Sequence, residues 1–237
     1  METPTQPKDS SIYTPFSVTA RLANGLVASN DYTPELSSIL EYFWLEQRGL
    51  LQSCPNPETA INADIPIAKH VIGRDWQWAI SAPIYTYTEH TETRRRHWDA
   101  DFDYPINWGK RSQKIQTDAG KFKSFRKPIF VRLTDCITWY AVGDLEATKA
   151  LLSECRLIGA NRNTGYGRVL QWSVKVIAED WSLVREGQLM APTPCAVYSD
   201  LGIDLAGSVM HWNRRAPRWD KTQADLCVMP NLVKRHV

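Results

Sequence analysis

Strand-like and helix-like segments follow one another in this chain in an order that restricts the fold. Residues 16–22 alternate between apolar and polar side chains, which predicts a half-buried strand. A helix is expected from Thr33 to about Gly49, because Thr33 suits the N-cap, Pro34 suits the first helical position, and apolar residues then recur three and four residues apart. A second helix is expected after Asp144, which is a favourable cap.

Four further segments have the aromatic and β-branched content of strands. They are 76–85, 128–133, 137–142 and 169–177. The resulting order of strands and helices is typical of α+β proteins whose helices cover one face of a largely antiparallel sheet, as in ferredoxin-like (RRM-like) folds. We expect this domain to span residues 12–179, followed by a proline-rich extension over 180–237 that packs around it.

The segment 88–127 interrupts this pattern with polar, basic and aromatic residues that show no sustained periodicity. Its length is unusual for a plain loop and favours a functional excursion such as an extended hairpin. The chain has a net charge of +2, but residues 94–132 contain 11 Lys and Arg against 4 Asp and Glu, whereas the rest of the chain contains 17 against 22. Positive charge is therefore concentrated where a polyanion could bind. We call residues 88–127 the basic insertion.

A glycine-rich loop follows the second expected helix and contains three glycines and two arginines within residues 159–168. Glycine lets the backbone adopt positive φ and approach a ligand closely, while arginine supplies charge and a planar set of donors, so the loop could bind a phosphate. The loop lacks the Gly-Lys-Ser/Thr ending of a P-loop and follows a helix instead of opening one, which disfavours a mononucleotide cofactor. A turn that only joins the helix to the next strand would contain the same glycines.

The composition argues against several other classes of protein. With 43% hydrophobic and 23% charged residues, the 237-residue chain resembles ordinary globular proteins. No segment approaches the ~18 apolar residues of a membrane span, so we expect a cytoplasmic protein without a membrane partner. The five cysteines lack zinc-site spacing, and Asp99, Asp101 and Asp103 lack the downstream Gly and Glu of a calcium loop. Neither a metal nor a cofactor is expected.

Several segments resemble the RAMP superfamily of CRISPR proteins, whose members carry a glycine-rich loop after the last helix of a ferredoxin-like domain. The spacing Gly159-x5-Gly165-x-Gly167 fits that loop, although Leu157 and Ile158 stand where the fuller motif has another glycine. The other matching segments are 137–144, 165–169, 215–219 and 226–230. The sequence is most similar to the small RAMP subunit of type IV CRISPR effector complexes, a relative of the subunit that caps the 5′ handle of guide RNA.

This resemblance implies a prokaryotic, non-enzymatic RNA-binding subunit. Its partners would be the CRISPR guide RNA, the repeating backbone subunits and the large subunit of the effector complex. Contact with target DNA near the protospacer-adjacent motif stays open. The basic insertion would correspond to the thumb that such subunits extend between guide-RNA bases.

The predicted RNA-binding residues lie in the loop and in the basic insertion. In the loop they are Asn161, Arg162, Asn163, Gly165, Tyr166, Gly167 and Arg168. In the insertion they are the cations Arg94, Arg95, Arg96, Lys110, Arg111, Lys114, Lys121, Lys123, Arg126 and Lys127. Candidates for stacking on bases are Trp98, Tyr104, Trp108, Phe122 and Phe125.

Two other functions remain open from the sequence. A RAMP endoribonuclease that processes precursor guide RNA would need a general acid or base, and His97 beside three arginines is the best placed of five candidates. These candidates are His70, His90, His97, His211 and His236. A purely protein-interaction module would explain the ten tryptophans and the proline-rich extension. Five residues of the extension could contact a neighbouring subunit or target DNA, or could instead pack over the core of their own domain. They are Trp212, Arg214, Arg215, Arg218 and Trp219.

Overall fold

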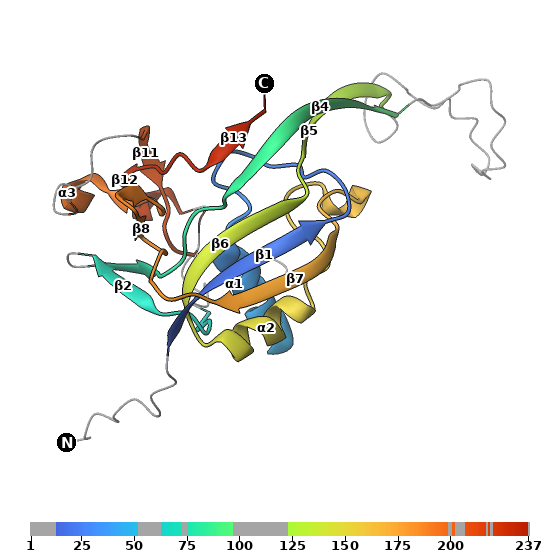
Figure 1. Ribbon diagram of the computed structural model, residues 1–237. Helices are drawn as coiled ribbons and strands as arrows, with labels where there is room; N and C mark the ends of the chain where they lie inside the picture. The colour runs from blue at the N-terminus through green and yellow to red at the C-terminus, as the bar shows by residue number, and fades with distance from the viewer. Residues whose placement is uncertain are drawn as a thin grey trace, which may run out of the picture.

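The structure is a computed structural model, and a three-stranded antiparallel sheet lies at its centre (Figure 1). It describes residues 13–51, 63–72, 75–96, 123–198, 201, 207–216, 218 and 220–236. The strands are β1 (Thr14–Leu22), β6 (Cys136–Gly143) and β7 (Val169–Val176), in the order β6-β1-β7. Residues 79–84 run along the outer side of β6, where the Ser81 amide donates to the Tyr140 carbonyl (2.8 Å) and the Ile84 amide to the Thr138 carbonyl (2.9 Å).

Two helices cover one face of this sheet: α1 (Leu36–Gln47) follows β1, and α2 (Leu145–Ser153) follows β6. The Asp144 carboxylate accepts the Ala147 amide (2.9 Å) and caps α2, as expected. The expected cap of α1 is wrong. Glu35 occupies the N-cap without a capping hydrogen bond, because the Thr33 hydroxyl is used in a preceding turn, where it donates to the Asn30 carbonyl (3.2 Å).

The strand order confirms the predicted ferredoxin-like α+β fold. A strand, a helix, the extended segment 79–84 beside the strand β6, a second helix and a last strand next to the first make up the pattern of that fold. The expected strand over 76–85 is divided. Its first part belongs to the hairpin of β2 (Lys69–Ile72) and β3 (Asp75–Trp78), and its end begins β4. Pro83 has no amide hydrogen and so cannot donate to a continuous ladder.

A long antiparallel hairpin extends from the sheet between residues 84 and 136 (Figure 1). Its strands are β4 (Tyr85–Arg96) and β5 (Phe125–Leu133), and β13 (Val233–Arg235) pairs in parallel with the start of β4. These strands contain both ends of the basic insertion, and residues 97–122 lie outside the described part. No helix in the described ranges is long and apolar enough to cross a membrane.

The C-terminal residues form small elements of their own. They are β8 (Val184–Arg185), β9 (Gln188–Leu189), β10 (Thr193–Pro194), α3 (Cys195–Tyr198), β11 (Val209–Trp212), η5 (Lys221–Gln223, a 3-10 helix) and β12 (Asp225–Val228). Earlier in the chain, the glycine-rich loop contains the 3-10 helix η3 (Arg162–Thr164). Strands β10, β12 and β11 make a second antiparallel sheet. This part of the chain contacts α1 through Arg218, whose half-buried guanidinium donates to Glu35, Glu41 and Ser37.

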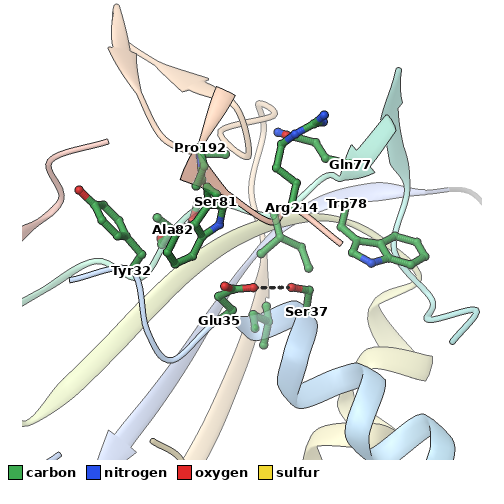
Figure 2. A pocket seen from close by; sticks show the side chains of 13 residues that line it. Tyr32, Glu35, Ser37, Gln77, Trp78, Ser81, Ala82, Pro192 and Arg214 are labelled. Atoms are coloured by element: carbon green, nitrogen blue, oxygen red, sulfur yellow. Dashed lines mark hydrogen bonds between the residues drawn. The ribbon is translucent and has the colours of Figure 1, made fainter. Parts of the chain in front are cut away.

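A cavity of about 50 Å³ lies beside that contact, between the start of α1 and the C-terminal segment (Figure 2). Glu35 and Ser37 form one wall, and Gln77, Trp78 and Arg214 line other parts of it. The volume is sufficient only for a few water molecules. We therefore regard this cavity as part of the packing between the C-terminal segment and the domain.

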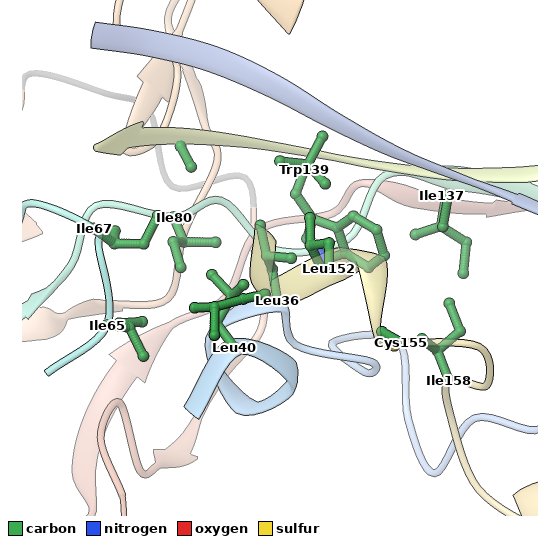
Figure 3. Packing of buried hydrophobic residues seen from close by; sticks show 14 of the residues in the cluster. Leu36, Leu40, Ile65, Ile67, Ile80, Ile137, Trp139, Leu152, Cys155 and Ile158 are labelled. Carbon is green, nitrogen blue, oxygen red and sulfur yellow. The ribbon is translucent and has the colours of Figure 1, made fainter. Parts of the chain in front are cut away.

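The main hydrophobic core lies between the sheet and the two helices (Figure 3). Trp139 of β6 is fully buried against Leu36 and Leu40 of α1 and Leu152 of α2. Its indole nitrogen donates to the Pro34 carbonyl (3.1 Å), so the one polar atom of this side chain is satisfied. This core fixes the position of the loops that follow β1 and α2, which build the candidate site.

Candidate functional site

The two strands of the hairpin place like charges directly opposite each other. In the register of β4 and β5, Arg94 pairs with Lys127 and Arg95 pairs with Arg126. Such neighbours lie about 4.5–5.5 Å apart at Cβ, where like charges destabilise a sheet. All four side chains are exposed, and among the described residues none has a carboxylate within ion-pair distance. The hairpin therefore holds uncompensated positive charge that an anion would neutralise.

This charge is distributed over both faces of the hairpin. Successive side chains of a strand point to opposite faces, so Arg94 and Lys127 share one face while Arg95 and Arg126 share the other. Arg96 is half-buried and lies opposite Phe125, whose side chain is 38% exposed. Lys123 is exposed just before β5.

The glycine-rich loop is fixed to the segment that follows β1. The Gly167 amide donates to the Gly25 carbonyl (3.0 Å), the Ala160 amide to the Val27 carbonyl (2.8 Å), and the Arg168 amide to the Asn24 side chain (2.9 Å). Gly167 has φ +69°, and a Cβ there would meet the Ile158 carbonyl oxygen at 1.9 Å. Packing alone therefore requires glycine at this position.

Gly165 differs from Gly167 because nothing lies within 4 Å of the place where its Cβ would be. Its φ of +94° nonetheless favours glycine, and it ends η3. Asn161, which precedes η3, adopts a left-handed conformation with φ +55°. The first turn of such a helix leaves amide donors without helical acceptors, so this exposed part of the loop presents donors.

Tyr166 connects the loop to the hairpin. Its hydroxyl donates to the carboxylate of Glu92, which lies on the same face of β4 as Arg94. That hydrogen bond raises the pKa of the Tyr166 phenol, and the nearby Arg94 guanidinium opposes the rise. The loop and the charged end of the hairpin thus belong to one continuous surface.

The two loop arginines point in different directions from this connection. The Arg162 guanidinium carbon lies 5.8 Å from the centroid of the Tyr42 ring on α1. Arg168 is exposed, and its carbonyl accepts the Ala23 amide beside the end of β1. Asn161 and Asn163 are also exposed. The structure therefore brings Tyr166 to the hairpin but Arg162 to α1.

Several predicted residues lie outside the described part of the chain. They are Lys110, Arg111, Lys114 and Lys121 among the cations, and His97, Trp98, Tyr104, Trp108 and Phe122 among the other candidates.

Two grooves next to this surface were missed by reasoning from the sequence. One, of about 330 Å³, lies between α1 and the glycine-rich loop and includes Tyr42 and Arg162. The other, of about 730 Å³, lies at the base of the hairpin and includes Asn24, Lys234 and His236. Tyr42 falls beside the apolar stripe that predicted α1, and an aromatic residue there is the only local signal. Lys234 and His236 reach the hairpin by the pairing of β13 with β4, which no local signal predicts.

The histidines proposed as catalytic lie in different places. The His70 ring nitrogen Nε2 is 2.7 Å from the Ser182 hydroxyl, and this buried hydroxyl donates to Asp180 (2.6 Å). Burial lowers the pKa of His70, and Asp180 opposes that effect. His90, His211 and His236 are exposed on separate strands or ends. Across the described ranges, no three His, Cys, Asp or Glu side chains are grouped as a metal site would need.

The residues considered for a protein interface mostly contact their own chain. Trp212 packs edge-on against Tyr32, with ring centroids 5.4 Å apart. Arg214 forms an ion pair with Asp225, and Arg215 lies over the Trp76 ring at 5.1 Å. Together with the contact of Arg218 with α1, these contacts attach the C-terminal segment to the domain. Trp219 lies outside the described residues.

Comparison with curated proteins finds no match. Among solved structures, the chain is similar to a chain in the cryo-EM structure of the Type III-B Cmr-beta bound to cognate target RNA, with a TM-score of 0.35 and 10% identity. The similarity covers 70% of this chain and 62% of that chain, so it spans less than two thirds of the relative's length.

The family comparison extends over almost all of the described residues. The model of a CRISPR type IV family matches residues 14–230, from the start of β1 to the end of the C-terminal sheet. This match includes the segments 137–144, 165–169, 215–219 and 226–230, on which the resemblance to type IV RAMP proteins rested, and it confirms that resemblance. The chain therefore belongs to the family described as CRISPR type IV associated protein Csf3.

Proposed function

We propose that this Csf3-family protein is a non-catalytic subunit of a type IV CRISPR ribonucleoprotein, which binds the 5′ handle of the guide RNA, caps the backbone filament and supports recognition of target DNA. The like-charged pairs of the hairpin carry the proposal, because they reduce the stability of the fold and are compensated when an anion binds. A nucleic acid backbone supplies phosphates in series, and the hairpin presents cations on both faces.

The contact between the hairpin and the glycine-rich loop supports this function further. Tyr166 joins the two elements through Glu92, so a bound strand would contact the cations of the hairpin and the amides of the loop together. Phosphate contacts of this kind orient a nucleic acid but do not read its sequence. The protein would thus hold the handle in a fixed shape from which backbone subunits assemble.

Removal of the hairpin charges tests the proposal. Replacing Arg94, Arg95, Arg126 and Lys127 by Gln should strongly reduce the guide RNA retained in purified complexes. If each cation contacts one phosphate, the slope of log affinity against log salt should fall by about 3 for single-stranded RNA. Filter binding of repeat RNA at several salt concentrations measures the slope.

A matched control replaces four exposed cations elsewhere by Gln. These are Arg48, Lys69, Lys149 and Lys175. Retention of RNA should stay close to that of the unaltered protein. Equal RNA content in all three complexes would contradict RNA binding by the hairpin. Cleavage of repeat RNA by the isolated chain, abolished by His97→Ala, would contradict the non-catalytic role.

A further inference from the structure

The groove between α1 and the glycine-rich loop has the lining of a site for a flat aromatic group. Tyr42 lies at its edge with 38% of its side chain exposed, and packs edge-on against Phe43 with ring centroids 5.1 Å apart. Ile39, Leu157 and Ile158 contribute apolar surface. The volume of about 330 Å³ lies at the small end of the range for ligand pockets.

Among the described residues, the charged groups around this groove are paired with one another, apart from Arg162. The Glu35 carboxylate is ion-paired with the half-buried guanidinium of Arg218. Burial raises the pKa of the Cys155 thiol to about 11, so this group is neutral at pH 7. Among the described residues, Arg162 has no carboxylate within ion-pair distance and lies 5.8 Å from the Tyr42 ring. The Tyr42 hydroxyl donates to Glu46 (3.4 Å), at the outer end of the ring.

We propose that this groove binds one unstacked nucleobase of the guide RNA, with the base against Tyr42 and the adjoining phosphate on Arg162. An aromatic ring beside an arginine is a common means of holding unpaired bases, because the ring stacks on the base while the guanidinium stacks or binds phosphate. The inference rests on the proposed function, since the strand must already lie along the glycine-rich loop. The loop borders the hairpin through Tyr166 and the groove through Arg162, so a strand could pass from one to the other.

Substitution of Tyr42 in the full-length chain tests the stacking contact. The probe is a fluorescent single-stranded RNA with the sequence of the CRISPR repeat. Tyr42→Leu should weaken binding between about 5-fold and 150-fold, which corresponds to the loss of one base–aromatic stack. Tyr42→Phe retains the ring and should bind almost as tightly as the unaltered chain. Thermal denaturation of both variants checks that they fold.

A scan with abasic RNA locates the base. Removing the base at one position of the repeat should weaken binding to the unaltered chain, and the same abasic RNA should show no further loss with Tyr42→Leu. Removal of a base at any other position should reduce affinity for both proteins equally.

Arg162→Gln tests the phosphate contact, and Arg156→Gln is its matched control. Arg156 is exposed just before the glycine-rich loop but does not line the groove. Arg162→Gln should lower the slope of log affinity against log salt by about 0.7, the value for one phosphate contact, whereas Arg156→Gln should leave the slope unchanged.

The outcomes separate this inference from the proposed function. If repeat RNA binds and the four hairpin substitutions weaken it, but Tyr42→Leu binds like the unaltered chain, the base site is wrong and RNA binding stands. If the hairpin substitutions have no effect, the proposed function fails independently. If Tyr42→Leu reduces association with another protein subunit and leaves RNA affinity unchanged, the groove binds protein, and the inference is overturned.

Discussion

At the scale of single residues, Arg218 shows how one side chain attaches the C-terminal segment to the domain. Its guanidinium donates to Glu35, Glu41 and Ser37 on or beside α1. Glu41 also accepts the Trp78 indole hydrogen (2.9 Å). Burial nevertheless raises the pKa of Glu41, against the attraction of Arg218. Glu35 and Glu41 both depend on Arg218 as their cation, so its removal leaves both carboxylates unpaired at once.

Arg218→Met should therefore reduce the free energy of unfolding by about 3–5 kcal/mol, because it leaves two partly buried carboxylates without their cation. Urea denaturation followed by tryptophan fluorescence measures the change. Arg48→Met, at the exposed end of α1, is the control and should change the value by less than about 0.5 kcal/mol. Equal stability of the two variants would mean that Arg218 is not required for attachment of the C-terminal segment.

At the scale of elements, the hairpin of β4 and β5 pairs like charges across its strands, whereas most sheets avoid such pairs. Its inner part is well packed, with Val131 and Ile129 buried, whereas its outer part opposes Arg94 to Lys127 and Arg95 to Arg126. The apolar packing of the inner part of the hairpin therefore offsets the charge repulsion between the pairs of its outer part. Such a conflict between local stability and charge is expected where residues serve binding.

Arg95→Glu should have opposite effects on stability and on binding. A carboxylate opposite Arg126 converts repulsion into attraction and should stabilise the hairpin by about 0.2–1 kcal/mol, while RNA binding weakens. Hydrogen exchange of the β4 and β5 amides and filter binding measure the two effects. Arg95→Gln removes the charge without adding attraction, so its hairpin stability and its RNA affinity should both lie between those of the unaltered protein and of Arg95→Glu. A loss of stability with Arg95→Glu would contradict the role assigned to this pair.

At the scale of the whole molecule, stability should depend on pH through groups that join separate parts of the chain. His70 of β2 contacts Ser182 and Asp180 after β7, and burial holds its pKa below the ordinary value of 6.5. The folded protein thus resists protonation of this ring more than the unfolded chain does. The corresponding stability is fully present above about pH 6.5 and is lost as pH falls through the lowered pKa.

Comparison with His70→Gln isolates this contribution. The unaltered protein should lose stability relative to the variant as the pH falls below about 6.5, as measured by urea denaturation at a series of pH values. Glu41 does not interfere, because it is present in both proteins. Parallel curves for the two proteins would show that His70 does not titrate differently in the folded state.

The order of helices and strands, the second helix cap and the place of the glycine-rich loop could all be predicted from the sequence. Each depends on periodicity, capping or backbone freedom within a short window, which local residues determine. The predicted cap of α1 was wrong because the Thr33 hydroxyl is used in a preceding turn. The strand predicted over 76–85 is divided because Pro83 has no amide hydrogen and because residues 79–84 bond to β6 instead of continuing β3.

The candidate surface was predictable in composition but not in arrangement. The sequence by itself determined that cations, aromatic residues and glycines occur in the hairpin and the loop. Only the tertiary structure decided that Arg94 lies opposite Lys127, that Tyr166 reaches Glu92, and that Arg162 turns to Tyr42. These contacts join residues far apart in the chain, and strand register and core packing set them, so no local pattern encodes them.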